Sequence, residues 1–542
     1  MSFNSEVSVE LHVKYLLPEI ILLVAASLAT LLGLFKNDST RKLAQWAALL
    51  GTLVAGIVSL GYLKIGGSPV LNILPVEWFT NEVADLAGVM PQFAYVTTLA
   101  CFIGFLSTLA AWNMPSKADP NVVDDNYRGE FYGMMLFSLM GVAMIGKVND
   151  LIWLFVVLEL VSIPTYIMVA TSRSQIVAQE AGVKYFFLGA LAAAIFLFGF
   201  SYIYGTTGAT RYADIIRFIG ANGLTPLAVI GLLMVIVGVG YKIASVPLHF
   251  YAADVYQGAA TPVTAFLAFA PKAAGIVAII SMLSLVNFQF AGSSSNTAIG
   301  ATITVMAILT MTVGNVLALL QRNIKRILAY SSIAHSGYML VGLASGLGKP
   351  GDLISNGVSA ALFYLAAYAI MNLGTFAVLI YLQGKADAAE DIDDLAGVAK
   401  EHPVAAFALA ICLFSLIGMP LTIGFFGKLY IIQAALANGH TILAIITVIN
   451  AAIAAAYYLK IIAAMYLRDA WNPFTVRPVF AIKTAATLCT VLVLVFGVLP
   501  SALLTFAGFP ADPARLPAIE QPKETKKKAE AVTPAETLIV KN

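Results

Sequence analysis

Charged residues are scarce in this sequence. Only 11% of its 542 residues are Asp, Glu, Lys or Arg, whereas 60% are hydrophobic. Water-soluble domains have a charged share of about 25%. Together with a mean hydropathy of +0.87, this composition excludes a soluble globule and predicts a polytopic integral membrane protein.

Cysteines and common catalytic motifs are also lacking. The three cysteines, Cys101, Cys412 and Cys489, lie in apolar runs without short spacings. This pattern favours ordinary packing over disulfides, zinc sites or iron–sulfur ligation. The sequence has no H-E-x-x-H, P-loop, G-x-S-x-G or C-x-x-C-H motif, and no G-x-G-x-x-G follows a strand. We therefore expect no bound cofactor or metal and no redox chemistry on this chain.

A strong charge excess is missing too. The net charge of +2 does not indicate a nucleic-acid partner, which requires a clustered basic face. The N-terminus has Glu6 and Glu10 before its first apolar run, which is the wrong pattern for a cleavable signal peptide. The first span is therefore expected to stay in the membrane.

Long apolar runs dominate what is present. Runs of about 20 residues are long enough to cross a bilayer as helices, and their count predicts an all-α protein with about fourteen spans. The predicted spans are 15–35, 43–63, 90–112, 130–147, 150–171, 182–204, 225–246, 260–286, 298–320, 325–346, 354–382, 403–437, 440–467 and 481–506.

The connections between spans differ in their content of lysine and arginine. By the positive-inside rule, the cytoplasmic set contains Lys36, Arg41, Lys42, Lys117, Arg128, Arg173, Arg322, Lys325, Arg326, Lys385, Lys400, Arg468 and Arg477. Both termini then lie outside, against the bias of Lys526, Lys527 and Lys528. The tail 510–542 has a composition typical of disorder.

Two connections have an unusual composition. Residues 65–89 contain no lysine or arginine and are expected to fold over the outer surface. The connection 383–401 is acidic, with Asp387, Glu390, Asp391, Asp393 and Asp394. We interpret it as a solvated loop rather than a binding surface.

Two spans are interrupted by glycine and proline, around Pro247 and around Pro420. The first break is flanked by Lys242, His249 and Asp254, and Lys428 follows the second. Interrupted helices with ionisable groups form midplane ion sites in many secondary transporters, and paired breaks indicate structural repeats.

Ionisable residues inside apolar spans are costly and usually functional. Burial disfavours the charged form of a lysine and a nearby carboxylate favours it, so a lysine whose partner moves can bind and release a proton. We predict that Glu159 modulates the series with Lys184 as its partner, and that Lys242, Lys272, His335 and Lys428 form a hydrated relay. An alternative interpretation of His335 is a buried histidine that is only hydrogen-bonded. For Lys184 and Lys460 the alternative is a long side chain that extends to the membrane interface. The aromatic pairs Phe186/Phe187, Tyr457/Tyr458 and Phe425/Phe426 favour packing roles.

Several of these segments resemble a known family. They are Leu17 to Ile20, Glu159, Lys184 to Phe186, Lys242 to His249, Asp254 to Ala259, Thr261 to Val263, Lys272, Lys325 to Ser332 with His335, and Pro420 to Lys428. They resemble the antiporter-like subunit N of bacterial NADH-quinone oxidoreductase (complex I), over nearly the whole chain except the tail. The chain departs from that pattern at Tyr251 to Ala253, Ala260 and Pro271, where the family commonly has other residues.

The resemblance implies a translocase subunit without redox chemistry of its own, which pumps protons while other subunits use NADH, FMN, iron–sulfur clusters and quinone. It implies Glu159 and Lys184 as the modulating pair, Lys242 as the central lysine, Lys272 as the connecting one and Lys428 as the outer one. It also implies the neighbours M, J and K and a bacterial inner membrane. The implied division is three N-terminal helices (1–128), two inverted five-helix repeats (129–286 and 298–468), a last helix (469–509) and the tail (510–542).

Two other functions remain open from the residues. A subunit of a multi-subunit sodium/proton antiporter would use similar lysines. A membrane subunit of a hydrogenase or of a ferredoxin-driven complex would share the mechanism with another electron donor.

Overall fold

The computed structural model describes residues 16–62, 64–65, 68–69, 93–112, 128–171, 176–286, 294–346, 355–383, 390–470, 476, 479–501 and 503. The predictions for the N-terminal segment, for most of 65–89, for Asp387 and for the tail 510–542 lie outside these ranges.

In the N-terminal part, the described residues form three helices and a short hairpin, α2 (Leu17–Gly33), α3 (Asp38–Leu60), β1 (Lys64–Ile65), β2 (Ser68–Pro69) and α5 (Phe93–Ala110). Pro18 stands in the first turn of α2, and the Asn37 side chain caps α3, both common helix starts. Gly33 faces Gly129, in the helix that follows α5, so closely that a Cβ on either would clash with the other's backbone. The N-terminal helices therefore pack directly against the next part of the chain.

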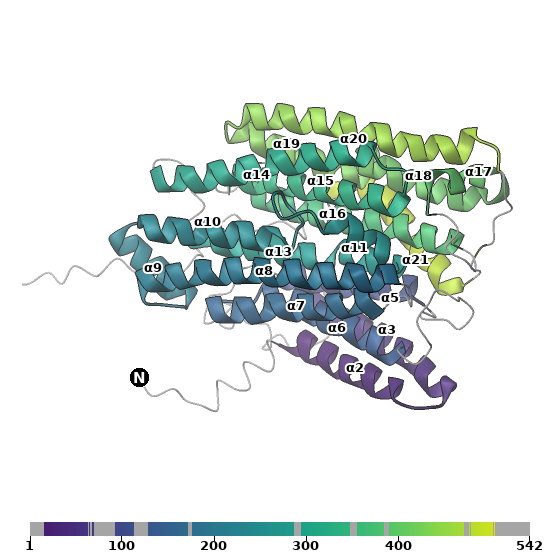
Figure 1. Ribbon diagram of the computed structural model, residues 1–542, viewed down its shortest axis with the longest axis horizontal. Coiled ribbons are helices and arrows are strands. Elements are labelled where there is room, and N and C mark those ends of the chain that lie inside the picture. The colour runs from purple at the N-terminus through teal and green to yellow at the C-terminus, as the bar shows by residue number, and fades with distance from the viewer. Residues whose placement is uncertain are drawn as a thin grey trace, which may run out of the picture.

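The middle of the chain forms α6 (Arg128–Ile145), α7 (Leu151–Thr171), α8 (Ile176–Thr207), α9 (Tyr212–Asn222), α10 (Pro226–Gly240), α11 (Ala252–Gly258), α12 (Thr261–Leu267) and α13 (Ala270–Ser284). The last part forms α14 (Ser294–Leu319), α15 (Ile324–Ser345), α16 (Gly357–Leu382), the 3₁₀ turn η3 (Ile392–Leu395), α17 (Val398–Glu401), α18 (Pro403–Ile417), α19 (Ile423–Ala437), α20 (Thr441–Leu467) and α21 (Phe480–Val498). Figure 1 shows the long helices side by side, from α2 at one edge to α20 at the other.

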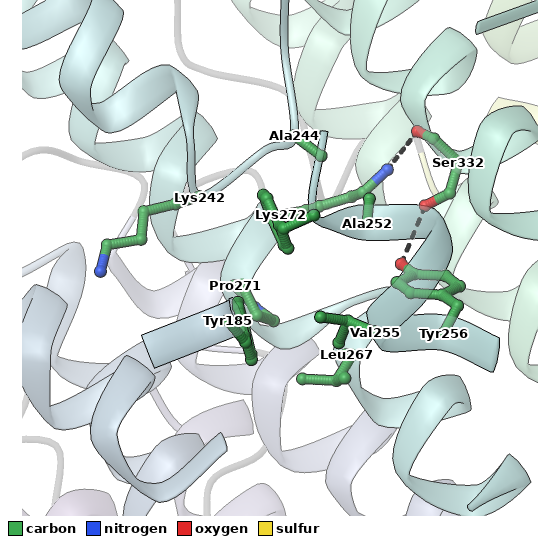
Figure 2. Close-up of a pocket in the computed structure, with 11 residues that line it drawn as sticks. Tyr185, Lys242, Ala244, Ala252, Val255, Tyr256, Leu267, Pro271, Lys272 and Ser332 are labelled. Atoms are coloured by element: carbon green, nitrogen blue, oxygen red, sulfur yellow. Dashed lines mark hydrogen bonds between the residues drawn. The ribbon is translucent and has the colours of Figure 1, made fainter. Parts of the chain in front are cut away.

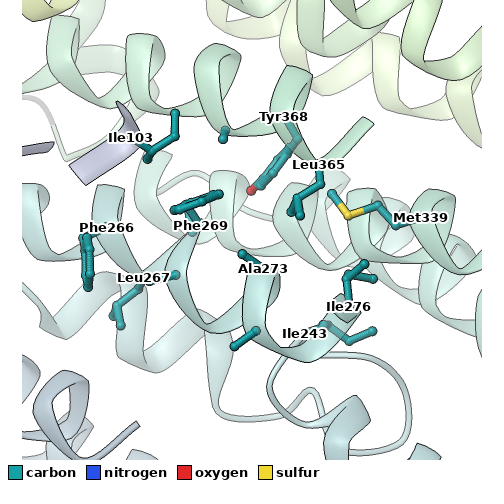
Figure 3. Packing of buried hydrophobic residues seen from close by; sticks show 14 of the residues in the cluster. Ile103, Ile243, Phe266, Leu267, Phe269, Ala273, Ile276, Met339, Leu365 and Tyr368 are labelled. Carbon is teal, nitrogen blue, oxygen red and sulfur yellow. The ribbon is translucent and has the colours of Figure 1, made fainter. Parts of the chain in front are cut away.

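The expected all-helical membrane fold is confirmed. Among the described residues, nine helices are long and apolar enough to cross a membrane, and five apolar helices are shorter. In α15 and in α16, 94% of an 18-residue apolar stretch is buried, whereas only 39% of such a stretch is buried in α8 and in α20. The buried core is therefore centred on α13, α15 and α16. Phe269, Ile276 and Met339 belong to this core (Figure 3). Outer helices expose large apolar side chains such as Phe187 and Ile442.

The helix interruptions lie where proline and glycine indicated them. After α10 the backbone turns at Lys242 to Ser245, and Ala244 has a φ of 54°. Between α18 and α19, Gly418 has a φ of 92° and Leu421 one of 68°. These left-handed conformations interrupt the helical hydrogen bonding, and a buried lysine lies near each break, Lys242 at the first and Lys428 after the second.

One buried ion pair was not anticipated. Lys147, which we assigned to a connection, donates to Oε2 of Glu19 at 2.7 Å, and the two side chains are 1% and 3% exposed. Nζ of Lys147 also lies 5.8 Å from the centre of the Tyr62 ring. In the sequence both residues lie near the ends of predicted spans. The sequence could not show that these span ends, which are 128 residues apart, meet in the fold. The pair joins α2 to the end of α6.

Lys147→Met is expected to lower the free energy of unfolding by about 3–5 kcal/mol, because it leaves the Glu19 carboxylate buried without its cation. The measurement is thermal denaturation of the purified protein in detergent. The control is Lys400→Met, which removes an ion pair to Asp469 whose side chains are 68% and 89% exposed, and little change is expected there. Equal melting curves for the two variants would show that the buried pair is not stabilising.

Candidate functional site

Lys242 lies at the break after α10 and is 3% exposed. Its Nζ donates to Oε1 of Glu159 at 3.1 Å and to Oγ of Ser162 at 2.6 Å. Glu159 and Ser162 are three residues apart on α7, so they share one helix face. The Tyr166 and Tyr241 rings lie 6.0 and 5.9 Å from Nζ. The partner of Glu159 in the structure is therefore Lys242, whereas the sequence predicted Lys184.

Lys184 has other partners than the predicted one. Its Nζ lies 2.8 Å from Oε1 of Glu180 and 2.9 Å from Oδ2 of Asp254, and its side chain is 43% exposed. The prediction that Lys184 pairs with Glu159 is wrong in this structure. Lys184 lies near the start of α8, where its long side chain reaches the interface, which is the alternative considered from the sequence.

Asp254 connects two distant helices at that interface. It accepts from Lys184 of α8 and, at 2.9 Å, from Nη1 of Arg326 of α15. Arg326 also donates to Oε1 of Gln257 at 3.0 Å. Asp254 thus belongs to a partly exposed network rather than to the buried series.

Lys272 is 2% exposed and lies in the first turn of α13, directly after Pro271. Its Nζ donates to the carbonyl oxygen of Ser332 and lies 5.0 Å from the centre of the Tyr368 ring. In Figure 2, Lys272 points toward Ser332 while Lys242 points the other way. A cavity of about 10 Å³ is lined by both lysines, and this is roughly the room that one water molecule needs.

Hydroxyl groups connect Lys272 with the second half of the chain. Oγ of Ser332 is hydrogen-bonded to the Tyr256 hydroxyl at 3.0 Å and to the Tyr368 hydroxyl at 2.7 Å. The adjacent Ser331 hydroxyl is hydrogen-bonded to Tyr458. Tyr458 is fully buried, so the packing role assigned to it from the sequence is incomplete. A helical spacing of tyrosines inside apolar spans is the signal that would have indicated these groups.

His335 is 1% exposed and has a hydroxyl partner at each ring nitrogen. Nδ1 lies 2.7 Å from the Tyr364 hydroxyl and Nε2 lies 3.1 Å from the Tyr458 hydroxyl. A neutral imidazole accepts at one nitrogen and donates at the other. The ring therefore fits the interpretation as a satisfied buried histidine, and it also joins two hydroxyl groups in one chain of hydrogen bonds.

Lys428 is 6% exposed and is held by the end of a half-helix. Its Nζ donates to the carbonyl oxygens of Leu416 and Ile417, at 3.0 and 2.7 Å. The last carbonyls of a helix lack intrahelical partners and form its negative end. Nζ also lies 5.0 Å from the centre of the Tyr338 ring. Lys460 of α20, in contrast, is exposed.

A hydrogen-bonded pair of asparagines supports the Tyr338 ring. Nδ2 of Asn315 donates to the Tyr338 hydroxyl at 3.3 Å and to Oδ1 of Asn450 at 3.1 Å. The Tyr457 hydroxyl donates to Oδ1 of Asn315 at 3.1 Å. Among the described residues, no group of histidines, cysteines and carboxylates has the arrangement of a metal site.

Comparisons with known proteins agree with this architecture. The family model for NADH:quinone oxidoreductase/Mrp antiporter transmembrane proteins matches residues 148–454. NADH-quinone oxidoreductase subunit N of Trichlorobacter lovleyi is 35% identical over 92% of this chain and 96% of its own length. The protein of that name from Rhodospirillum rubrum is 37% identical over 87% of this chain and 92% of its own. A chain of respiratory complex I from Thermus thermophilus superposes with a TM-score of 0.70 and 29% identity, covering 91% of this chain and all of that one.

Double-mutant cycles that measure the stability of the purified protein test which lysine pairs with the Glu159 carboxylate. Glu159→Gln and Lys242→Met are expected to be coupled by about 0.5–3 kcal/mol, as for residues in contact. Glu159→Gln and Lys184→Met should be additive within about 0.5 kcal/mol, because Lys184 pairs with Glu180 and Asp254. Coupling to Lys184 as strong as that to Lys242 would contradict the observed pairing.

Proposed function

Because the chain belongs to the family of NADH-quinone oxidoreductase subunit N, we propose that it translocates protons in the membrane arm of such a complex, through a relay of buried side chains. The observation that supports this most directly is the ion pair between buried Lys242, at a helix break, and half-buried Glu159. Lys272, His335 and Lys428 lie in the same helical interior, with tyrosine and serine hydroxyls between them.

In this proposal Glu159 controls the first lysine. While the carboxylate contacts Nζ, the ammonium form of Lys242 is favoured, and moving or protonating the carboxylate removes that stabilisation. The proton can then pass through the cavity toward Lys272, whose amine accepts it. Lys272 donates to the Ser332 carbonyl, and from there the proposed route continues through the adjacent Ser331 hydroxyl, Tyr458 and His335 to Lys428.

The remaining features of the proposal follow from the family. Helices α6–α13 and α14–α20 would be the two inverted repeats. NADH oxidation and quinone reduction would take place on other subunits, which hold the FMN and the iron–sulfur clusters. The neighbours would be the subunits M, J and K, in a bacterial inner membrane.

Lys242→Ala is expected to abolish most of the proton pumping and coupled quinone reduction of the assembled complex in proteoliposomes. The reason is that alanine cannot hold the proton that Glu159 controls. The hydrophilic arm should still oxidise NADH with an artificial acceptor at the normal rate, which shows that the complex is assembled.

The matched control is Lys460→Ala, which removes an exposed lysine of α20 and should leave pumping unchanged. If the Lys242→Ala complex pumps as fast as the unmodified complex, Lys242 is not part of the relay. If the unmodified complex reduces quinone without pumping, the proposed function itself fails.

A further inference from the structure

Lys325, in the first turn of α15, is a buried lysine outside the series described above. Its side chain is 2% exposed. Its Nζ donates to the carbonyl oxygen of Ala259 and to Oε1 of Glu390, each at 3.3 Å. A buried ammonium is costly in a membrane protein and usually marks a functional position. The sequence assigned Lys325 to a cytoplasmic connection, where such burial is not expected.

The segment that supplies Glu390 is packed against α15. The Ile324 amide donates to the Glu390 carbonyl at 2.7 Å, and the Ile392 amide donates to the Arg322 carbonyl at 3.1 Å. The backbone of this part of the connection is therefore attached to the start of α15, while Asp391 and Asp393 stay exposed as expected of a solvated segment. The Glu390 side chain is 29% exposed, so its carboxylate lies between the aqueous surface and the buried ammonium.

The acidic side chains of the segment around Glu390 favour proton binding at this edge of the protein, beside the start of α15. Burial, followed by the charges of Asp394, Glu390 and Asp393, raises the pKa of Asp391 above its ordinary value. Arg468 pairs with Asp393 and Lys400 with Asp469 at the same edge. The positive-inside rule assigns this edge to the cytoplasm, which is the side from which the proposed function takes up protons.

Two contacts between α11 and α15 lead from Lys325 into the interior. The first contact joins Lys325 to the Ala259 carbonyl at the end of α11. The second joins the Ser332 hydroxyl to the Tyr256 hydroxyl. Ser332 lies two turns after Lys325 in α15, and Tyr256 lies about one turn before Ala259. Seven residues of α-helix correspond to about 10 Å. At the inner end of this interval the Ser332 carbonyl accepts from Lys272. The interval thus runs from the cytoplasmic edge to the relay.

Building on the proposed function, we propose that Glu390 and Lys325 form the entry by which protons reach Lys272 from the cytoplasmic side. The Lys325 ammonium gives one proton, through water and the Tyr256 and Ser332 hydroxyls, to the neutral amine of Lys272. The neutral amine of Lys325 then takes a proton from the Glu390 carboxylic acid, and the carboxylate regains one from cytoplasmic water. Each cycle moves one proton and restores both side chains.

The neighbouring Arg326 has a different role. Its guanidinium contacts Asp254 and Gln257, and arginine stays protonated in proteins. It can hold α11 against α15, but it cannot release a proton. Lysine at position 325 combines burial with an amine that can do so.

Two conservative substitutions in the assembled complex test the entry. Lys325→Arg keeps the cation and its pairing but cannot be deprotonated, and Glu390→Gln keeps the size of the side chain but cannot bind a proton. Each is expected to lower proton pumping and coupled quinone reduction about tenfold or more, the lower part of the range for a proton-transfer group. NADH oxidation with an artificial acceptor should be unchanged.

The matched control is Asp393→Asn, three residues from Glu390, which removes the ion pair with Arg468. It should pump normally, and Glu390→Asp should restore most of the activity lost in Glu390→Gln. Normal pumping by Lys325→Arg would overturn the proposal and assign Lys325 a structural role. Equal losses in Asp393→Asn and Glu390→Gln would overturn it in favour of a general effect of the segment. In both cases an unmodified complex that pumps shows that the proposed function still holds.

Discussion

A buried ammonium group needs hydrogen-bond acceptors, and the interior of this protein is arranged around that requirement. A lysine in the hydrocarbon region is tolerated only where partners replace its water shell. Continuous helices offer few such partners, because their carbonyls bond to their own amides. At the second break the last carbonyls of α18 are free to accept from Lys428, whereas Lys242 at the first break is held by two side chains of α7.

The breaks in turn require precise packing around them. The turn after α10 is enclosed because α13 passes close to Lys242 at Gly275, where a Cβ would contact Ile243 and the Lys242 side chain. Near the second break, Gly424 lies against the Ser415 carbonyl of α18. Glycines thus permit the close approach that keeps irregular backbone out of lipid, as is required at membrane depth. Polar function and tight packing are therefore the same constraint in this interior.

Sequence reasoning was successful where one physical effect dominates. Hydrophobicity indicated the membrane fold, and the cost of burying charge identified Lys242, Lys272 and Lys428 as interior groups. It failed where the outcome depends on which helices meet. Lys184 was assigned to Glu159, whereas it pairs with Asp254 of α11. Lys147 and Glu19 have ordinary positions near span ends, and only the fold brings them together. Tyr458 resembles a packing aromatic until its hydroxyl is located beside His335.

Lys242, Lys272 and Lys428 differ in how easily their partners can be changed. Lys242 is held by a carboxylate, which can rotate away or become neutral by binding a proton. Lys428 is held by two backbone carbonyls at a helix end, and within the part of the chain that the structure describes no carboxylate lies within ion-pair distance of it. Lys272 likewise bonds to a carbonyl. Backbone dipoles are fixed unless the helix moves, so the stabilisation of Lys272 and Lys428 is nearly constant. Proton binding can therefore be controlled most easily at Lys242, whereas Lys272 and Lys428 respond to the charge that reaches them.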